Sequence, residues 1–135
     1  MKQRLLISLL VIIGLIAISG QGCNKEDDTI SYIIKVDSIT HADTIVAADG
    51  FEVRFYGKIG DNDCYEFLKF DNGFGPQEIN VTVYGLETIR NDCQGGPVML
   101  NGKGAIYFDM TSGDWTIRVH QPDGVSYIES SVYVR

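Results

Sequence analysis

The sequence predicts an all-β protein built as one antiparallel β-sandwich of the immunoglobulin-like type. Short runs in which apolar and polar residues alternate recur about every 10–15 residues, which is the pattern of half-buried strands. Turn residues separate the runs, and beyond residue 31 no stretch repeats its apolar residues with the period of a helix. About six to eight short strands in a chain of this length favour a sandwich. A small β-barrel is the competing fold, because alternating strands also close into barrels.

The first two predicted strands differ in clarity. Residues 32–39 form a split strand, because the alternation breaks near Ser38, and residues 44–47 continue it. After the turn pair Asp49-Gly50, residues 51–59 alternate most clearly. We expect their inward-facing side chains to be Phe51, Val53, Phe55 and Ile59.

The middle of the chain predicts two further strands. Residues 65–70 are apolar on both faces, which is typical of a central strand or of a strand with a bulge. The turn residues Asp71-Asn72-Gly73 are expected to end this strand. The next strand alternates again, and its inward row is Ile79, Val81 and Val83.

Three more strands follow at residues 106–110, 115–119 and 128–134, separated by turn residues. Their inward rows are Ile106, Phe108 and Met110, then Trp115, Ile117 and Val119, then Ile128, Ser130, Val132 and Val134. The last two strands resemble the closing hairpin of an immunoglobulin-like domain. That hairpin is common to many unrelated sandwiches, so the likeness predicts a fold and assigns no family.

The N-terminus carries an export signal. Lys2 and Arg4 precede an apolar run, residues 5–18, which is too short to span a bilayer. Small residues and then Cys23 follow. The segment resembles a bacterial lipoprotein signal of the Bacteroidota type, in which the cysteine is acylated and becomes the mature N-terminus. The resemblance implies that residues 1–22 are a signal peptide and that Cys23 is lipidated. It also implies a multiply acylated cysteine, which is sufficient for stable membrane anchoring.

An acidic run, Glu26-Asp27-Asp28, follows the cysteine. In the lipoproteins that this segment resembles, such a run is similar to a signal for transfer to the outer cell surface. The resemblance therefore implies an outer-membrane protein that faces the cell exterior. The alternative is that the run is only a solvated tether. We expect a tether over residues 23–31 and a folded domain over residues 32–135.

Lipidation of Cys23 leaves Cys64 and Cys93 as an even pair in an exported chain. Export places them in an oxidising compartment, where a disulfide persists. Metal binding or a redox pair is less favoured, since the chain has no C-x-x-C motif and no histidine near either cysteine. We therefore predict a Cys64–Cys93 disulfide.

The charge of the chain excludes nucleic acid as a partner. Without residues 1–22, nine basic residues (11 minus Lys2 and Arg4) face 18 acidic ones, which gives a net charge of −9. Such a chain repels phosphate backbones, and no basic stripe counters the repulsion.

Sequence motifs of catalysis are missing, so we expect no enzyme, no cofactor and no metal site. The chain has no G-x-S-x-G, H-E-x-x-H, P-loop or dinucleotide motif. The two histidines, His41 and His120, are expected to be solvated surface groups. Asp61 and Asp63 offer oxygen ligands, but Ca²⁺ needs six to eight of them. We interpret the Asp61-Asn62-Asp63 segment as a turn.

Aromatic residues give the one indication of binding. Five tyrosines fall on the outward phase of their strands, namely Tyr56, Tyr84, Tyr107, Tyr127 and Tyr133. Tyrosines on an exposed face anchor protein partners or stack on sugars, although tyrosine is also a good strand former. The predicted function is a non-catalytic binding module for an envelope protein or a glycan. The alternative is a structural subunit of a surface assembly, joined by pairing of an exposed edge strand, with the last strand as its expected edge.

Overall fold

The computed structural model describes residues 28–135 of the chain. The predicted signal peptide, the predicted lipidation site Cys23 and the acidic residues Glu26 and Asp27 lie outside the described residues. Every regular element from Asp28 onward is a β-strand. Within this part of the chain, no helix has the length and apolar character needed to cross a membrane.

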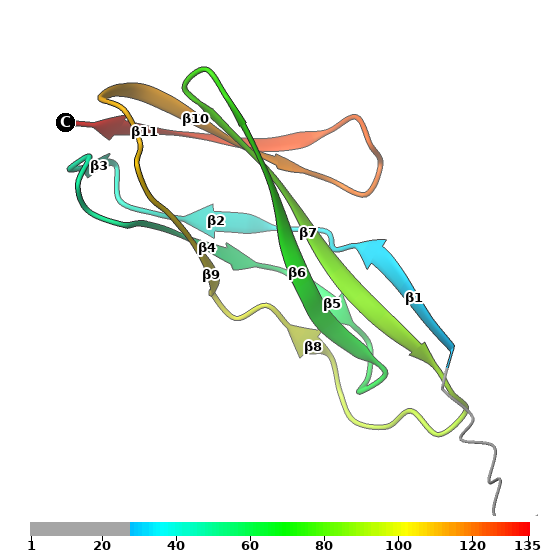
Figure 1. Cartoon of the computed structure of the whole chain (residues 1–135). Coiled ribbons are helices and arrows are strands. Elements are labelled where there is room, and N and C mark those ends of the chain that lie inside the picture. Colours follow the sequence, from blue (N-terminus) through cyan, green and yellow to red (C-terminus); the bar gives the residue numbers. More distant parts are fainter. Residues whose placement is uncertain (1–27) are drawn as a thin grey trace, which may run out of the picture.

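The described residues form a two-layered β-sandwich (Figure 1). One layer is a six-stranded sheet in the order β1-β7-β10-β11-β3, with β6 also paired to β7. The other contains the sheet β2-β4-β9 and the two-stranded sheet β5-β8. The strands are β1 (Asp28–Ile33), β2 (Ser38–Thr40), β3 (Thr44–Ile45), β4 (Phe51–Tyr56), β5 (Lys58–Gly60), β6 (Tyr65–Gly75), β7 (Glu78–Ile89), β8 (Val98–Met99), β9 (Lys103–Tyr107), β10 (Gly113–His120) and β11 (Tyr127–Val134).

The predicted sandwich is confirmed, and the barrel is excluded because the sheets are not closed. The prediction of purely antiparallel strands is wrong for the large sheet, which is mixed, since β7 runs parallel to β10 and β3 runs parallel to β11. The predicted split of the first strand is also confirmed. It becomes β1, β2 and β3. β1 and β3 lie in the six-stranded sheet and β2 lies in the other layer, because the chain crosses between the layers twice.

The core lies between the two layers and follows most of the predicted inward rows. The fully buried side chains include Phe51, Val53 and Phe55 of β4, Ile79, Val81 and Val83 of β7, Ile117 and Val119 of β10, and Val132 and Val134 of β11. Burying one such side chain stabilises the fold by about 1.5–3 kcal/mol. The alternation therefore fixes which face of these four strands meets the other layer.

The β6–β7 hairpin differs from the prediction in its turn. Asp71-Asn72-Gly73 does not end the strand but pairs with β7 as part of an 11-residue strand. The turn lies at Pro76-Gln77, where proline pre-sets one φ angle and Gln77 takes a φ of 56°. The expected bulge is present, since the register shifts between Phe67 and Lys69. The hairpin runs along the length of the molecule (Figure 1).

The predicted facing of the strand at β9 is wrong. Ala105 and Tyr107 point into the core, and Tyr107 is only 3% exposed. Ile106 and Phe108, which were expected inside, are 58% and 64% exposed, while Met110 is buried as predicted. Register with β4 is the reason, because Ala105 lies opposite Val53 and Tyr107 opposite Phe51, both of which face the core. Paired residues in neighbouring strands point to the same side of a sheet.

The domain begins at β1, ahead of the predicted boundary at residue 32. Asp28 already pairs with Ile89 of β7. Further along β1, the hydroxyl of Tyr32 donates a hydrogen bond of 2.6 Å to the carbonyl oxygen of Ile59, which joins the two layers. Gly85 makes room for this ring, because a Cβ atom at that position would lie 2.6 Å from Tyr32 Cζ.

Alkaline pH is expected to destabilise the domain through Tyr32. Burial, followed by the neighbouring Tyr65 and Glu87, raises its pKa from 10.0 to about 12. The unfolded chain therefore loses this proton first. The stabilisation from neutral Tyr32 is complete below pH 10 and is lost as the pH rises to about 12. Urea unfolding at a series of alkaline pH values should show a smaller decline of the midpoint for Tyr32→Phe than for the unchanged protein. Parallel declines would rule out this role.

Candidate functional site

The five predicted tyrosines do not share one surface. Tyr107 is in the core, where burial raises the pKa of its hydroxyl and where it donates a hydrogen bond of 3.0 Å to Asn72 Oδ1. Tyr56 lies on the outer face of the β2-β4-β9 sheet. Tyr84, Tyr127 and Tyr133 lie on the outer face of the six-stranded sheet. Tyr127 and Tyr133 are 45% and 48% exposed.

Tyr127 lies beside a row of charged side chains that crosses three strands of the large sheet. Its ring meets His120 edge-on, with centroids 4.9 Å apart, and the Arg118 guanidinium lies 5.3 Å from its centroid. Arg118 forms ion pairs of 3.1 Å to Glu78 of β7 and 2.8 Å to Glu129 of β11. The hydrogen bond to Glu129, followed by the charges of both glutamates, raises the pKa of Arg118. The outer face of the six-stranded sheet therefore carries ion pairs between neighbouring strands, and its tyrosines do not form a continuous aromatic surface.

A more open surface lies at the edge of β4. The pairing of β2 with β4 stops at Thr40, opposite Arg54, because the chain then leaves for the other layer. The main-chain carbonyl of Tyr56 points toward β2 and accepts a hydrogen bond from the Asp37 amide. The carbonyl of Phe55 points the other way and accepts one from the Gly102 amide on the β9 side. Backbone groups alternate in direction along a strand. The peptide groups of Glu52 therefore point to the β2 side, beyond the last residue of β2.

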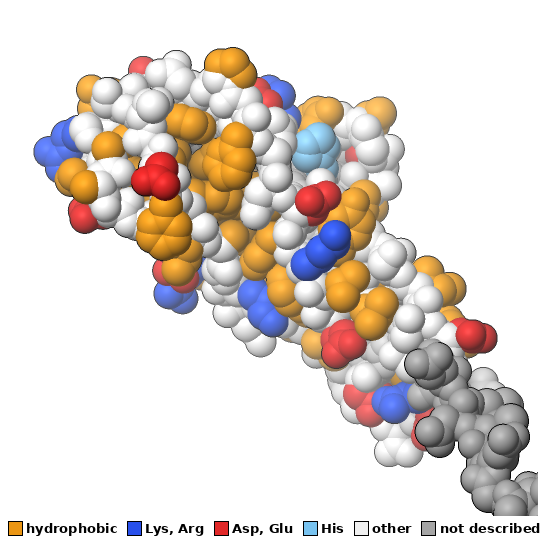
Figure 2. Space-filling model, viewed as in Figure 1, with side chains coloured by type: hydrophobic (Ala, Val, Ile, Leu, Met, Phe, Trp, Pro, Cys, Tyr) orange, Lys and Arg blue, Asp and Glu red, His pale blue; other side chains and the backbone are white. Residues whose placement is uncertain are grey.

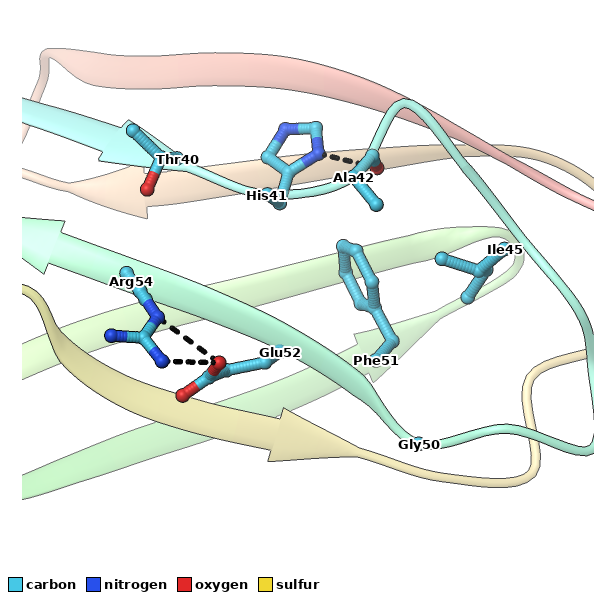
Figure 3. A pocket seen from close by; sticks show the side chains of 8 residues that line it. All are labelled: Thr40, His41, Ala42, Ile45, Gly50, Phe51, Glu52 and Arg54. Carbon is cyan, nitrogen blue, oxygen red and sulfur yellow. Dashed lines mark hydrogen bonds and ion pairs between the residues drawn. The ribbon is translucent and has the colours of Figure 1, made fainter.

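A pocket of about 360 Å³ occupies this edge, and we call it the β4 notch (Figure 3). Its lining residues are Thr40, His41, Ala42, Ile45, Gly50, Phe51, Glu52 and Arg54. The side chains of Glu52 and Arg54 form an ion pair of 2.9 Å on the outer side of the strand. The notch thus combines an apolar floor, a charged rim and a free stretch of sheet edge.

Two large apolar side chains stand beside the notch. Ile106 and Phe108 are both more than half exposed, and both approach Gly50, which lines the notch. A Cβ atom at Gly50 would lie 2.8 Å from Phe108 Cε1 and 3.3 Å from Ile106 Cγ2. Figure 2 shows hydrophobic side chains exposed at several places on one face of the molecule, including the end that carries β3 and the C-terminus. Adjacent exposed apolar side chains of this kind mark interaction surfaces.

His41 is not a simple solvated group, contrary to the prediction. Its Nε2 lies 2.7 Å from Ser130 Oγ of β11, and its Nδ1 lies 2.9 Å from the carbonyl oxygen of Ala42. Its ring also meets Phe51 edge-on, at 5.6 Å between centroids. Ser130 has the same strand phase as the buried Val132 and Val134, so the contact joins the β2–β3 connection to the large sheet. The imidazole thereby holds one wall of the β4 notch in place.

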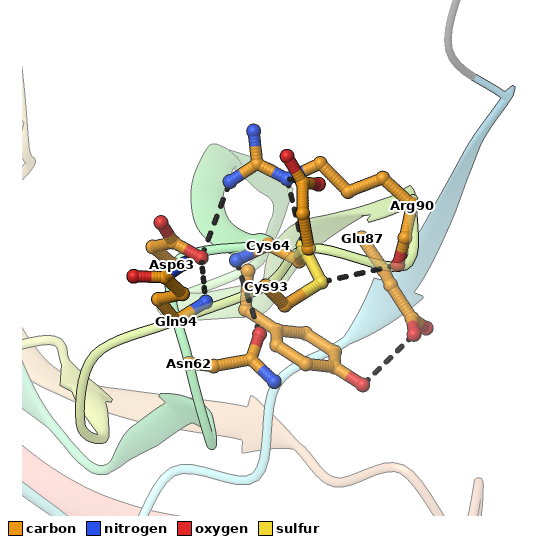
Figure 4. Close-up of a disulfide and its surroundings, with 9 residues drawn as sticks. Asn62, Asp63, Cys64, Glu87, Arg90, Cys93 and Gln94 are labelled. Atoms are coloured by element: carbon orange, nitrogen blue, oxygen red, sulfur yellow. Dashed lines mark hydrogen bonds and ion pairs between the residues drawn. A yellow bond between two sulfur atoms is a disulfide. The ribbon is translucent and has the colours of Figure 1, made fainter.

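The predicted disulfide joins Cys64 to Cys93 and holds the β7–β8 loop against the start of β6 (Figure 4). Arg90 lies beside it, with Nε 3.0 Å from Cys64 Sγ and an ion pair of 3.2 Å to Asp63. Asp63 also accepts a hydrogen bond of 2.8 Å from the Gln94 amide. That bond, followed by Arg90, lowers the pKa of Asp63. The disulfide is therefore surrounded by a second, polar set of contacts.

The acidic segment next to Cys64 is the expected turn. Asn62 Oδ1 accepts a hydrogen bond of 3.0 Å from the Cys64 amide, and Asp61 pairs with Lys58 at 2.7 Å. The ligand atoms of Asp63, Cys64 and Cys93 lie within 4.8 Å of one another. Disulfide sulfurs are not thiolates, so the group offers a metal only the Asp63 carboxylate. That carboxylate is already engaged by Arg90.

Comparisons with protein-family models, with curated proteins and with solved structures find no significant match for this chain. The function is therefore argued from its own residues.

Proposed function

We propose that this protein is a lipid-anchored cell-envelope protein that binds a protein or glycan partner and catalyses no reaction. The export signal that ends at Cys23 supports the anchor, and the acidic run after it supports an outer-membrane position facing the cell exterior. The lack of catalytic motifs in the sequence supports a binding role. A domain held by a lipid at its N-terminus can present its far end to a partner.

The β4 notch, together with Ile106 and Phe108, supports a protein partner best. The observation that carries this proposal is the exposure of these two side chains, 58% and 64%, beside an open sheet edge. An extended peptide can add to such an edge through main-chain hydrogen bonds, while apolar neighbours hold its side chains. Glu52 would supply the main-chain donor and acceptor. Tyr127 and Tyr133 are the contacts that we assign to a glycan partner, since tyrosine rings stack on sugars.

In the structural-subunit alternative, the C-terminal end of the expected edge strand is not open for pairing. The end of the last strand is covered, because Tyr133 and Val134 pair with β3. In addition, Arg135 donates to the Ile45 carbonyl and accepts from the Ala47 amide. If this protein is part of an assembly, we propose that a strand of the neighbouring subunit pairs with the free edge of β4 at Glu52. The same notch then receives a neighbouring subunit instead of a separate partner.

A photo-crosslinking residue in place of Phe108 is expected to capture a discrete partner in intact cells. Adding Ile106→Asp should remove at least most of this crosslink, because a charge cannot enter an apolar contact without a large desolvation cost. The variant should keep its fold, since substitutions at exposed positions usually change stability within about 0.5 kcal/mol. Protease treatment of the crosslinked species then separates a protein partner from a glycan, and its size separates a second copy of this chain from another protein.

The matched control carries the photo-crosslinking residue at Gln94, which is exposed in the disulfide loop and belongs to none of the proposed binding surfaces. Equal crosslinking from both positions, or a Phe108 crosslink that survives Ile106→Asp, would contradict the assignment of the notch. Cys23→Ser tests the anchor in the same cells. It should release the protein from the membrane fraction, and a variant that stays bound would contradict lipid anchoring.

A further inference from the structure

Gln121 is a buried polar side chain whose amide has no hydrogen-bond partner. It follows the last residue of β10 and is only 8% exposed. Neither Nε2 nor Oε1 bonds to another described residue. Its main chain is fully used, since its amide donates to Ser126 and its carbonyl accepts from Gly124. Among the described residues it is the one whose buried side-chain amide is orphaned in this way.

An orphaned buried amide is costly, and a leucine of similar size would avoid the cost. Gln121 has the core-facing phase of Ile117 and Val119, where the sandwich otherwise places aliphatic side chains. Local features that lower stability without structural need concentrate at functional sites. The amide therefore points to a ligand that completes its hydrogen bonds.

A second pocket, of about 230 Å³, lies at this residue. Its lining residues are Lys35 from the β1–β2 connection and Gln121, Pro122, Asp123 and Ser126 from the β10–β11 turn. Asp123 is already occupied, because it accepts hydrogen bonds from the amides of Val125 and Ser126 and from the Ser126 hydroxyl. Lys35 forms no ion pair within residues 28–135. Among the side chains that line the pocket, the hydrogen-bond donors left for a ligand are the Gln121 amide and the Lys35 ammonium.

We propose that this pocket binds one saccharide unit through two neighbouring hydroxyl groups. The carbonyl oxygen and the NH₂ of a glutamine lie side by side, so one hydroxyl can donate to Oε1 while the next accepts from Nε2. Because both amide atoms are buried, binding requires a change of the Gln121 rotamer that turns the amide into the pocket. Lys35 donates to a further hydroxyl, and the Pro122 ring packs against the C–H face of the sugar.

A peptide group fits this amide less well. The N–H and the C=O of one trans peptide unit point in opposite directions, so both Nε2 and Oε1 are satisfied only by a residue held extended, whose own N–H and C=O point to the same side. Ordering a flexible chain in that conformation costs conformational entropy that a rigid sugar ring does not lose. Neighbouring hydroxyls of a pyranose lie on one edge and satisfy both. A nucleobase edge also matches an amide, but a net charge of −9 beyond residue 22 repels its phosphates. This site lies apart from the β4 notch and does not depend on it.

The test is a titration of the full chain in detergent micelles, followed through the NMR signals of the Gln121 side-chain amide. The probes are the methyl glycosides of glucose, galactose and mannose, with acetamide and N-methylacetamide as amide probes. At least one glycoside should shift the Gln121 signals saturably, and the amide probes should not. No response to any glycoside, a response to acetamide alone, or contact of the amide with one long-lived water only would each overturn the proposal.

Gln121→Leu separates binding from structure. It should weaken glycoside binding at least tenfold and yet raise Tm by about 4–8 °C, because the orphaned amide is gone. Gln94→Leu is the matched control, since Gln94 is exposed in the disulfide loop and should change neither quantity. Lys35→Met, at an exposed position, should weaken binding without changing Tm. Unchanged binding in both Gln121→Leu and Lys35→Met would contradict the assigned contacts, whereas the notch experiment would be unaffected.

Discussion

Replacing Cys64 and Cys93 together by alanine is expected to lower the free energy of unfolding by about 3.5 kcal/mol. The bridge joins residues separated by 29 positions, and its loss frees that loop in the unfolded chain. Single domains are typically stable by only about 5–15 kcal/mol, so the change is a large part of the total. The loop from Arg90 to Pro97 contains no strand, and its ties to Asp63 are exposed. Alanine avoids placing a hydroxyl at the buried Cys64 position.

Urea unfolding of the oxidised protein and of the double variant measures this loss. The midpoint should fall, and the dependence on urea should steepen, because the unfolded chain without the crosslink exposes more surface. Cys23→Ala is the control, since that residue lies outside the described domain. A double variant no less stable than this control would mean that the ties of Arg90 and Asp63 hold the loop without the disulfide. Reduction of the unchanged protein should reproduce the result of the double variant.

The sequence predicts best the strands that have one buried face and one solvent-exposed face. In β11, for example, Val132 and Val134 are buried while Tyr133 between them is exposed, and the alternation shows this directly. The same is true of Val53 in β4 and Val81 in β7. A strand whose two faces differ in solvent exposure must differ in composition, and one residue of slip would reverse every side chain. The disulfide was equally predictable from the number of cysteines and the expected compartment.

The facing of β9 could not be predicted because its residues are apolar on both faces. Ala105, Ile106, Tyr107 and Phe108 follow one another without a polar residue, so alternation leaves two phases open. Register with β4 selects one phase, and register is a property of the pairing between strands. In β6, Asp71-Asn72-Gly73 is similarly a turn by composition, but ladder pairing with β7 keeps it extended.

The two candidate sites were hidden from the sequence for a related reason. The β4 notch exists because β2 leaves β4 after Thr40, which depends on where the chain crosses between layers. Gln121 matches no motif, and its interest lies in the burial of an unpaired amide. The alternation of β10 gives a weak signal, since extending the inward row of Ile117 and Val119 by two residues places a glutamine inside. The outward phase of the five tyrosines was a poor guide to a binding surface, because Tyr107 lies in the core and the others lie on two separate faces.

Tyr107→Ala is expected to cost about 3–5 kcal/mol of unfolding free energy, the range for removing a large aromatic side chain from a core. Its ring packs against Phe51 and Phe74, at 6.2 and 5.9 Å between centroids. Tyr107→Phe keeps these contacts and loses only the hydrogen bond to Asn72, so its cost should be about 0.5–1.5 kcal/mol. Urea midpoints of the two variants measure how much of the contribution is packing and how much is the hydroxyl.

Ile106→Ala is the matched comparison, because the two residues are neighbours in β9 and face opposite sides. At 58% exposure, Ile106 should contribute little to stability, and its loss should change the free energy of unfolding by about 0.5 kcal/mol or less. If Ile106→Ala instead proved as destabilising as Tyr107→Ala, β9 would have the facing that alternation alone predicts. The apolar surface beside the β4 notch would then disappear. A large loss at Tyr107 with a negligible one at Ile106 would leave Ile106 without a structural role, as the proposed binding surface requires.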